Sequence, residues 1–322
     1  MYSESAKSQL EQLRRGVVDI IPSEDALLDK LERSIKERRP LRVKLGIDPT
    51  STELHLGHIV PLRKLMQFQE LGHHAILIIG TFTALIGDPE GRKSTRPHIS
   101  RQEVLENAKE CQFQIERLIG SSKIEIVYNG DWLDQLSAID FMKITERITL
   151  QQLLTRKDFA SRIKTDSPLH IHELMYPTVM GYDSVHLHAD VELGATEQVL
   201  NIYMGRELQE QHDQEPQVGI ILPILVGLDG TEKMSKSLGN YIGIQETPKR
   251  MFDKVSSIPD SQITLYYTLL TSKSTSEISK IEEELRTGLV SPEVTKRNLA
   301  IEIVGIFHGR EIAERINIDN FE

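Results

Sequence analysis

Apolar and polar residues follow two patterns along the first two thirds of the chain. The apolar run 75–79 is typical of a strand buried on both faces of a parallel sheet. It follows a strand-like run at 41–47 and a helical pattern that Gly72 ends. This strand–helix–strand order is a βαβ unit. Further strands are expected at 123–128, 185–187 and 220–225. The pattern predicts an α/β fold with a Rossmann-like parallel sheet.

Amphipathic patterns predict helices between these strands and throughout the last part of the chain. Before residue 210 they cover 10–17, 26–38, 100–119, 131–154, 172–182 and 196–208. After residue 247 they cover 248–255, 261–270, 275–287 and 291–307. The polar and basic stretch 156–167 is expected to be a mobile connector. We therefore expect a Rossmann-like domain at 1–227 with an insertion at about 112–170, a loop at 228–246, and a smaller all-helical domain at 247–322.

The composition argues against several kinds of protein and of site. The chain has 322 residues, of which 39% are hydrophobic, and this is long enough for a full core. One cysteine, Cys111, excludes an intrachain disulfide and fits an intracellular, cytoplasmic setting. No apolar run suits a signal peptide or a membrane span, and no Cys/His cluster resembles a metal site. The net charge of −10 argues against a surface that binds nucleic acid over its whole extent.

The stretch His55-Leu-Gly-His58 joins the strand at 41–47 to the helix that follows it. Two imidazoles near a helix start lie close to the positive end of the helix dipole, and Gly57 lets a phosphate approach the backbone. Histidines in such a place are more often caps or surface residues than catalysts. The stretch alone therefore leaves both interpretations open.

A second stretch, Lys233-Met-Ser-Lys-Ser237, follows the last predicted strand. On charge alone it is a solvated loop. Its position after a buried strand, with Gly227 and Gly230 as hinges, favours a functional loop instead. Ligands of Rossmann-like sheets bind beyond the carboxyl ends of the strands, so this loop, 46–58 and 80–88 are expected to converge.

Together, these two stretches resemble the two signatures of class I aminoacyl-tRNA synthetases. Residues 46–50 and 176–183 resemble the tyrosyl-tRNA synthetase family in particular, and the resemblance runs from about residue 10 to the C-terminus. It implies activation of tyrosine by ATP to tyrosyl-adenylate, with Mg²⁺ bound through the nucleotide phosphates, and transfer of the tyrosyl group to tRNA.

The resemblance also implies roles for individual residues. Thr50, His55 and His58 match positions that hold the ATP phosphates, and Lys233 and Lys236 match lysines that clamp the leaving pyrophosphate. The remaining nucleotide positions are Gly46, Asp48, Gly57, Gly194, Glu197, Met234 and Ser235. The amino-acid pocket would comprise Thr81, Asp88, Tyr176, Met180, Asp183 and Gln198.

Within that pocket, Tyr176 and Asp88 match residues that hold the substrate ammonium, and Asp183 matches the acceptor of the substrate phenol. From the residues alone, Tyr176 and Asp183 lie seven apart on one helix face. That spacing equally fits a core aromatic residue and a capping or surface acid.

Several pocket positions depart from the family pattern. Met180 stands where the family has glutamine, Thr81 where it has an acid, and Glu197 where it has aspartate. Ala84 and Ala195 each replace a glycine. The alternative is therefore a synthetase-like paralogue that activates a different amino or carboxylic acid outside translation. A non-catalytic scaffold is disfavoured, because the phosphate-binding residues are all present.

The resemblance implies two partners besides the substrates. A homodimer would form through the insertion, unless its apolar residues are ordinary core: Phe113, Leu118, Trp132, Leu136, Ile139, Phe141 and Ile144. The acceptor end of tRNA would meet Arg156, Lys157, Arg162 and Lys164, unless these are a solvated face. Bacterial relatives continue with a basic RNA-binding module, whereas this sequence stops at Glu322, so weaker tRNA binding is expected.

Overall fold

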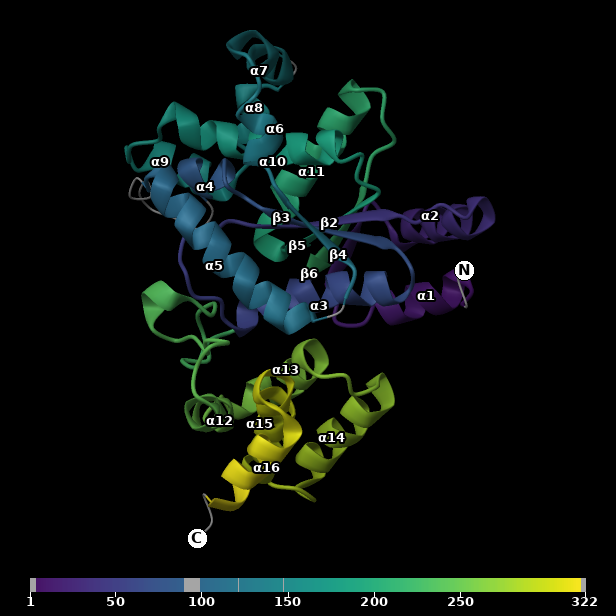
Figure 1. Ribbon diagram of the computed structural model, residues 1–322, viewed down its shortest axis with the longest axis vertical. Coiled ribbons are helices and arrows are strands. Elements are labelled where there is room, and N and C mark those ends of the chain that lie inside the picture. Colours follow the sequence, from purple (N-terminus) through teal and green to yellow (C-terminus); the bar gives the residue numbers. More distant parts are fainter. Residues whose placement is uncertain (1–3, 90–98, 121, 147, 320–322) are drawn as a thin grey trace. The chain divides into compact units, whose positions relative to one another are not determined.

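The computed structural model describes residues 4–89, 99–120, 122–146 and 148–319 (Figure 1). The chain divides into two compact units. The sheet unit comprises Met1–Thr52 and Lys64–Leu222, and the helical unit comprises Glu53–Arg63 and Pro223–Glu322. The sequence predicts three segments, 1–227, 228–246 and 247–322, which are distinguished by their expected roles, whereas these two units are defined by compactness. The three-segment division stays a prediction.

The sheet unit is built on one six-stranded sheet. Its strands are β1 (Asp19–Ile21), β2 (Arg42–Ile47), β3 (His74–Ile79), β4 (Ile124–Tyr128), β5 (Val191–Ala195) and β6 (Val218–Leu222). They lie in the order β1-β6-β5-β2-β3-β4, and only the edge strand β1 is antiparallel to its neighbour. The chain thus moves outward from β2 to β4 and then returns to β5 on the other side of β2. This confirms the Rossmann-like parallel sheet and places its topological switch point between β2 and β5.

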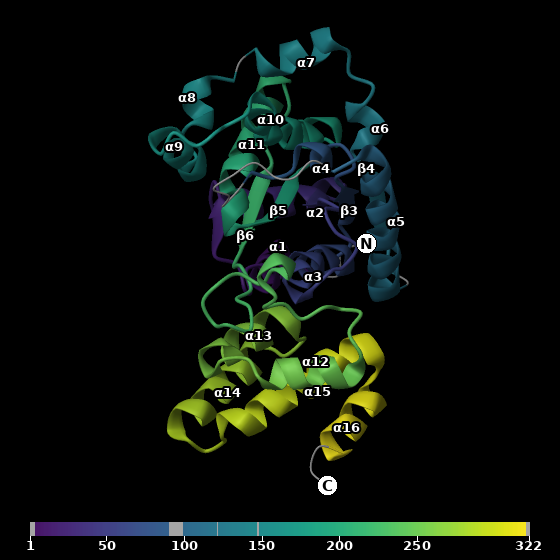
Figure 2. The same ribbon diagram turned by 90° about the vertical axis from the view of Figure 1, so that its left-hand side faces the viewer.

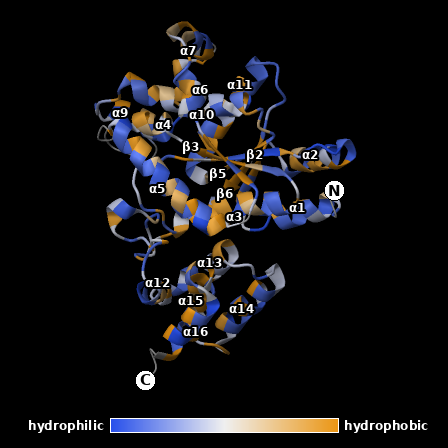
Figure 3. Cartoon of the chain, viewed as in Figure 1, coloured by the Kyte–Doolittle hydropathy of each residue, from blue (hydrophilic) through white to orange (hydrophobic). Residues whose placement is uncertain are grey.

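Helices cover both faces of this sheet. The helices of the sheet unit are α1 (Ala6–Leu13), α2 (Glu24–Glu37), α4 (Thr83–Ile86), α5 (Arg101–Ile119), α6 (Gly130–Leu133), α7 (Ala138–Thr145), α8 (Leu150–Leu153), α9 (Lys157–Lys164), α10 (Ile171–His186) and α11 (Val199–Gln211), with a 3₁₀ turn at Thr196–Gln198. Helix α3 (Leu56–Glu70) begins in the helical unit and continues into the sheet unit. Figures 1 and 2 show α10 and α11 on one face and α1 with the sheet-unit part of α3 on the other. Much of the strands between them is orange, the hydrophobic end of the scale, in Figure 3.

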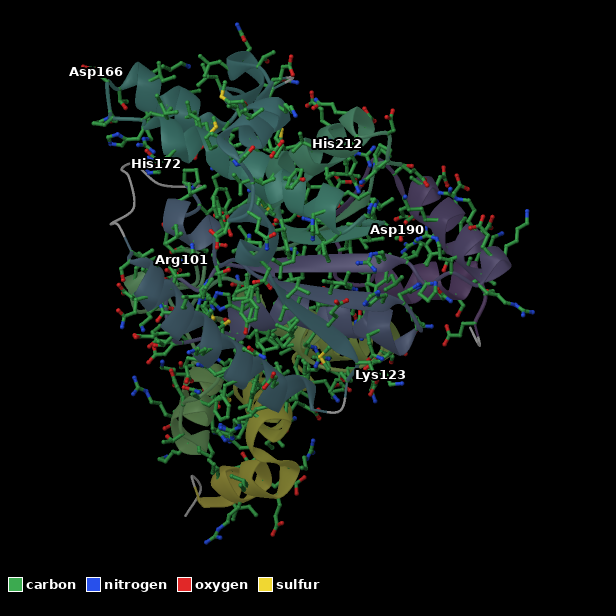
Figure 4. The ribbon with its side chains drawn as sticks, turned by 45° about the horizontal axis from the view of Figure 1, so that its top comes forward. Arg101, Lys123, Asp166, His172, Asp190 and His212 are labelled. Carbon is green, nitrogen blue, oxygen red and sulfur yellow. The ribbon has the colours of Figure 1, made fainter. Side chains whose placement is uncertain are left out.

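Local signals in the sequence explain where several elements begin. The Ser23 side chain accepts from the N–H of Ala26 and caps α2, and the Ser100 side chain accepts from the N–H of Glu103 and caps α5. Asp190, labelled in Figure 4, lies just before β5. Its carboxylate is 2.8 Å from the Arg39 guanidinium, which ties the chain after α2 to the sheet.

The structure corrects three expectations about secondary structure. Residues 131–154 form the short helices α6, α7 and α8 instead of one helix, and 156–167 contains α9 instead of a mobile connector. Residues 185–187 are the end of α10 and its C-cap instead of a strand. The pattern also missed β1, α4, β5 and α16.

The helical unit holds the start of α3 and the chain after β6. Its elements are the 3₁₀ turn Lys236–Leu238, α12 (Pro248–Ser256), the 3₁₀ turn Asp260–Gln262, α13 (Ile263–Leu270), α14 (Thr275–Thr287), α15 (Pro292–His308) and α16 (Arg310–Asp319). Helix α15 packs against α12, α13 and α16, and Phe252, Tyr266 and Leu299 are buried in this bundle. Within the part of the chain that the structure describes, no helix is long and apolar enough to cross a membrane.

Candidate active site

The predicted site residues fall in both units, and each group is described within its own unit. In the sheet unit, the floor of the candidate pocket is the strand β2. Gly46 lies inside the sheet yet is exposed, and a Cβ atom added to it would meet no atom within 4 Å. Open space therefore lies over β2, next to the switch point where Rossmann-like folds bind their ligands.

Asp48 follows β2 and carries the first group of polar contacts. Its Oδ2 accepts a hydrogen bond from the Tyr176 hydroxyl (2.9 Å), and its Oδ1 accepts one from the Thr83 hydroxyl (2.6 Å). A Cβ atom at Gly80 would lie only 2.0 Å from Oδ1 of Asp48, so this turn requires glycine. The strand end, the turn after β3 and α10 therefore meet at one carboxylate.

Asp88 carries the second group. Its Oδ2 accepts from the Gln198 amide (2.8 Å), whose Oε1 in turn accepts from Asn201 (2.6 Å). The guanidinium of Arg156 lies 3.8 Å from Oδ1 of Asp88. The structure thus brings two of the predicted pocket residues, Asp88 and Gln198, into direct contact.

Asp183 lies on α10 and is almost entirely buried, with 3% of its surface exposed. The indole N–H of Trp132 donates to Oδ1 (2.9 Å), and the Asn129 amide donates to Oδ2 (3.2 Å). Burial raises the pKa of Asp183 to about 7, although the nearby Lys44 charge and these two donors oppose the shift. Near neutral pH this carboxyl group can therefore accept or donate a hydrogen bond.

Three of the departures from the family pattern lie in or beside this network. Thr81 is buried, and its hydroxyl oxygen accepts the N–H of Gly130 (3.0 Å). Ala84 is also buried, in α4. Met180 is half-buried one helical turn after Tyr176, so the two side chains lie on the same face of α10. The roles of these residues, of Thr50, of Gly194 and Ala195 in β5, and of Glu197 in the 3₁₀ turn after β5 stay predictions.

In the helical unit, His55 and His58 lie at the start of α3 with ring centroids 3.9 Å apart. Nδ1 of His58 accepts the N–H of His55 (3.2 Å), and Nδ1 of His55 accepts the N–H of Gly57 (3.2 Å). Burial, helped at His55 by the neighbouring His58, lowers the pKa of His55 to about 2 and that of His58 to about 4. Both rings are therefore neutral near pH 7, and each carries its proton on Nε2, where it can donate.

The lysine loop belongs to the same unit. Met234 is buried, and its N–H donates to the carbonyl of Leu225 (2.8 Å). The Asn240 side chain accepts from the N–H of Ser235 (2.8 Å) and donates to the carbonyl of Lys233 (3.0 Å). A Cβ atom added to Gly57 would lie 3.9 Å from that of Met234, so the loop and the start of α3 are adjacent. Both lysine side chains, of Lys233 and Lys236, are exposed.

Two predicted tRNA contacts are wrong as stated. Arg156 and Arg162 are 4% and 2% exposed, so they are not part of a solvated basic face. The Arg162 guanidinium donates to both carboxylate oxygens of Glu173, at 2.7 and 3.0 Å, which anchors α9 to the start of α10. Lys157 and Lys164 are exposed.

The predicted dimer residues also divide into exposed and buried ones. Phe113 and Ile139 are 52% and 68% exposed and remain available to a partner. Ile144 instead packs into a buried cluster with Val185 and Met204, as an ordinary core residue would. Leu118, Trp132, Leu136 and Phe141 are half-buried.

Sequence reasoning missed several residues of the network. Asn129 and Thr83 gave no signal, because single polar residues near strand ends are common. Lys44 did give one, since it places a charge between the apolar residues Val43 and Leu45 of the strand. It is 1% exposed, and its Nζ lies 2.8 Å from Oε1 of Glu192. Among the described residues, no group of three or more His, Cys, Asp or Glu side chains could hold a metal ion.

Comparison with known proteins agrees with this architecture. The family model described as tRNA synthetases class I (W and Y) matches residues 36–318. Among solved structures, a C-terminally truncated mitochondrial tyrosyl-tRNA synthetase of Aspergillus nidulans has a TM-score of 0.81 at 20% identity and covers 99% of this chain and 94% of its own. The Archaeoglobus fulgidus enzyme in complex with L-tyrosine has a TM-score of 0.78 at 22% identity, covering 97% and 99%. At these identities the structures show a shared fold.

Sequence relatives are much more similar. The tyrosine–tRNA ligase of Carboxydothermus hydrogenoformans is 51% identical over 314 residues, which are 98% of this chain and 76% of that protein. The tyrosine–tRNA ligase of Moorella thermoacetica is 48% identical over 305 residues, which are 95% and 74%. The chain therefore belongs to the class I tRNA synthetase family of the tryptophan and tyrosine enzymes, on the branch of the tyrosine–tRNA ligases.

Proposed function

We propose that this chain activates tyrosine with ATP and transfers the tyrosyl group to tRNA. The 51% identity to a tyrosine–tRNA ligase over 98% of the chain carries the proposal. In the first step a tyrosine carboxylate oxygen attacks the α-phosphorus of ATP, and the bond to the bridging oxygen breaks. Pyrophosphate leaves with the electron pair. A ribose hydroxyl of the terminal tRNA nucleotide then attacks the carbonyl carbon, and AMP leaves.

The histidines and lysines of the helical unit suit the first step. Neutral His55 and His58 can donate Nε2–H groups to phosphate oxygens on which negative charge increases, beside the positive end of α3. Lys233 and Lys236 supply positive charge to the leaving pyrophosphate, and Thr50 a further hydroxyl. Removal of one such donor from a preorganised site costs about 3–4 kcal/mol of transition-state stabilisation.

Magnesium normally accompanies ATP in such reactions and would be held here through the phosphate oxygens. Mg²⁺ keeps several waters and is commonly bound through substrate phosphates with few protein ligands. The protein's contribution is therefore positioning and charge.

The network around β2 suits an amino acid with a phenol side chain. Asp48, Asp88 and the Tyr176 hydroxyl offer acceptors for an ammonium group, and Asp183 offers a group for the phenol hydroxyl. Tyrosyl-tRNA synthetase is a known example of discrimination by such a buried hydrogen bond, with a factor of about 10⁵ against phenylalanine.

The primary test is ATP–pyrophosphate exchange without tRNA, measured with tyrosine, phenylalanine and deaminated tyrosine analogues. Exchange with tyrosine, followed by tyrosine charging of tRNA, is the expected result. A Lys233→Ala variant serves as the control for background exchange, because it removes one of the proposed pyrophosphate ligands. Exchange with another acid and none with tyrosine would refute the proposal.

Met180 favours one second candidate, a paralogue that activates a different amino or carboxylic acid. A thioether cannot replace the amide acceptor that the family offers to an ammonium group. In Met180→Gln we expect exchange with tyrosine to rise about tenfold if the pocket has merely drifted from tyrosine, which corresponds to about 1.4 kcal/mol. A fall in exchange with tyrosine would show that methionine serves the substrate that this enzyme uses.

A further inference from the structure

Glu53 lies two residues before His55, in the segment that leads into α3. Its Oε2 accepts a hydrogen bond from the Tyr241 hydroxyl (3.0 Å) and lies 3.2 Å from Nζ of Lys236. All of these residues belong to the helical unit. A carboxylate at the start of α3 therefore contacts one of the two lysines assigned to the leaving pyrophosphate.

The backbone around this contact is paired. His55 and Gly243 form an antiparallel β-bridge. The N–H of Ile244 donates to the carbonyl of Leu54, and the N–H of Leu56 donates to the carbonyl of Ile242, both at 3.0 Å. This pairing holds the chain after the lysine loop against the residues that precede α3. The contact between Glu53 and Lys236 therefore rests on a fixed backbone frame.

Tyr241 orients the Glu53 carboxylate through the hydrogen bond from its hydroxyl, and its own position is held by other contacts. The Lys254 ammonium lies 4.9 Å from the centroid of the Tyr241 ring and donates to the Tyr241 carbonyl (2.8 Å). On another side, the ring centroid of His55 is 6.1 Å away. Lys236 and Tyr241 lower the pKa of Glu53, and Glu53 raises the pKa of Tyr241, so the acid is ionised and the phenol remains a donor.

We propose that Glu53 is a positioning residue that holds the Lys236 ammonium at the segment leading into α3 before ATP binds. The inference rests on the proposed function of the site. A free lysine side chain has many rotamers, and ordering it in advance lowers the entropy cost at the moment of reaction. Because the pair is about half exposed, at 45% and 46%, it is weak enough for the more highly charged phosphates to take the ammonium over.

The first test is Glu53→Gln, which removes the charge but keeps the shape and an oxygen acceptor for Tyr241. In pyrophosphate exchange we expect kcat to fall about two- to fivefold, the range that an exposed ion pair supports, with an unchanged KM for tyrosine. Asp253→Asn is the matched control, because it removes the carboxylate of another exposed lysine pair in the same unit, with Lys249. A higher kcat or a lower KM for ATP in Glu53→Gln would mean that Glu53 only competes with the phosphates, and would overturn the proposal.

The second test asks whether Glu53 acts through Lys236. In a Lys236→Ala background, Glu53→Gln should change kcat no further. Equal fold-changes in the two backgrounds would show that Glu53 acts independently of the lysine and would overturn the proposal.

A measurement without activity separates this inference from the proposed function. In the nucleotide-free protein, an amine-reactive reagent should modify Lys236 about two- to fivefold faster in Glu53→Gln than in the wild type, as read by mass spectrometry. Lys249 should react equally in both proteins. An unchanged rate at Lys236 overturns the inference even if tyrosine is activated normally. If the rate rises but tyrosine is not activated, the proposed function fails, and the kinetic comparison is made with the acid that the exchange panel identifies.

Discussion

The ion pair between Lys44 and Glu192 gives the sharpest prediction about stability. The two residues are direct neighbours in the register of β2 and β5, at the switch point of the sheet. Nζ and Oε1 lie 2.8 Å apart, and the side chains are 1% and 2% exposed. Lys44→Met keeps the length of the side chain and removes its charge, which leaves the Glu192 carboxylate buried without its cation.

The magnitude follows from that burial. Breaking a buried pair from one side costs about 3–5 kcal/mol, whereas replacing both partners by neutral groups is often close to neutral. Oε2 of Glu192 also accepts hydrogen bonds from the Gln217 amide and, at 3.4 Å, from the Ser184 hydroxyl, but both donors are neutral and do not replace the lost positive charge. We therefore expect Lys44→Met to lower the free energy of unfolding by about 3–5 kcal/mol. The double variant Lys44→Met/Glu192→Gln should recover most of that loss.

Urea unfolding followed by the fluorescence of Trp132 measures this directly. Trp132 is the single tryptophan of the chain, and it lies in the sheet unit together with the pair. Lys249→Met, which breaks an exposed pair with Asp253, should change the free energy of unfolding by less than about 0.5 kcal/mol. The reasoning is refuted if Lys44→Met costs under about 1 kcal/mol, or if the double variant is less stable than the single one.

Two further predictions concern other buried charges. Arg162→Ala should lower the free energy of unfolding by about 3–5 kcal/mol in the same assay, because it leaves the buried Glu173 carboxylate without its guanidinium. Lys164→Ala, on the exposed face of α9, should change it very little. Similar losses in the two variants would contradict the buried pair. For Asp183, whose pKa is raised to about 7, the folded protein keeps a proton between about pH 4 and 7 that the unfolded chain has released, so this group's contribution to stability falls as pH rises through that window. Between pH 5 and 8 the wild type should lose about 3 kcal/mol more than Asp183→Asn, as measured from urea unfolding at each pH, and equal losses would argue against the shifted pKa.

The regular part of the fold could be predicted from the sequence because its signals are local. The strand-like run of β2, the apolar run of β3 and the capping serines Ser23 and Ser100 can each be recognised from a few neighbouring residues. The strand β5 could not be found in this way. It is five residues long and contains Glu192, and a charged residue in so short a stretch is typical of an exposed turn. Only the ion pair with Lys44 explains why Glu192 is buried in a strand. That partner is distant in the sequence.

The same limit explains the wrong expectations. Residues 185–187 have strand-like side chains, but Val185 packs with Met204 and Leu208 of α11, and this packing extends α10 through the segment. Arg156 and Arg162 read as a solvated basic run because arginine is usually exposed. Their acids, Asp158 and Glu173, are nearby in sequence, but nothing local shows that α9 buries both pairs.

Substrate choice in this chain is better understood as a property of a connected network than of any single departure from the family pattern. Asn129 is 1% exposed, and its amide donates both to Asp183 (3.2 Å) and to the Thr83 hydroxyl (3.0 Å). Thr83 then donates to Asp48, which accepts from the Tyr176 hydroxyl, so hydrogen bonds run without a break from Asp183, proposed to meet the substrate phenol, to Asp48 and Tyr176, proposed to meet the substrate ammonium. Buried hydrogen bonds of this kind polarise one another, and a change at one member alters the others. We therefore expect a substitution at one end of this network to act on its other end as well.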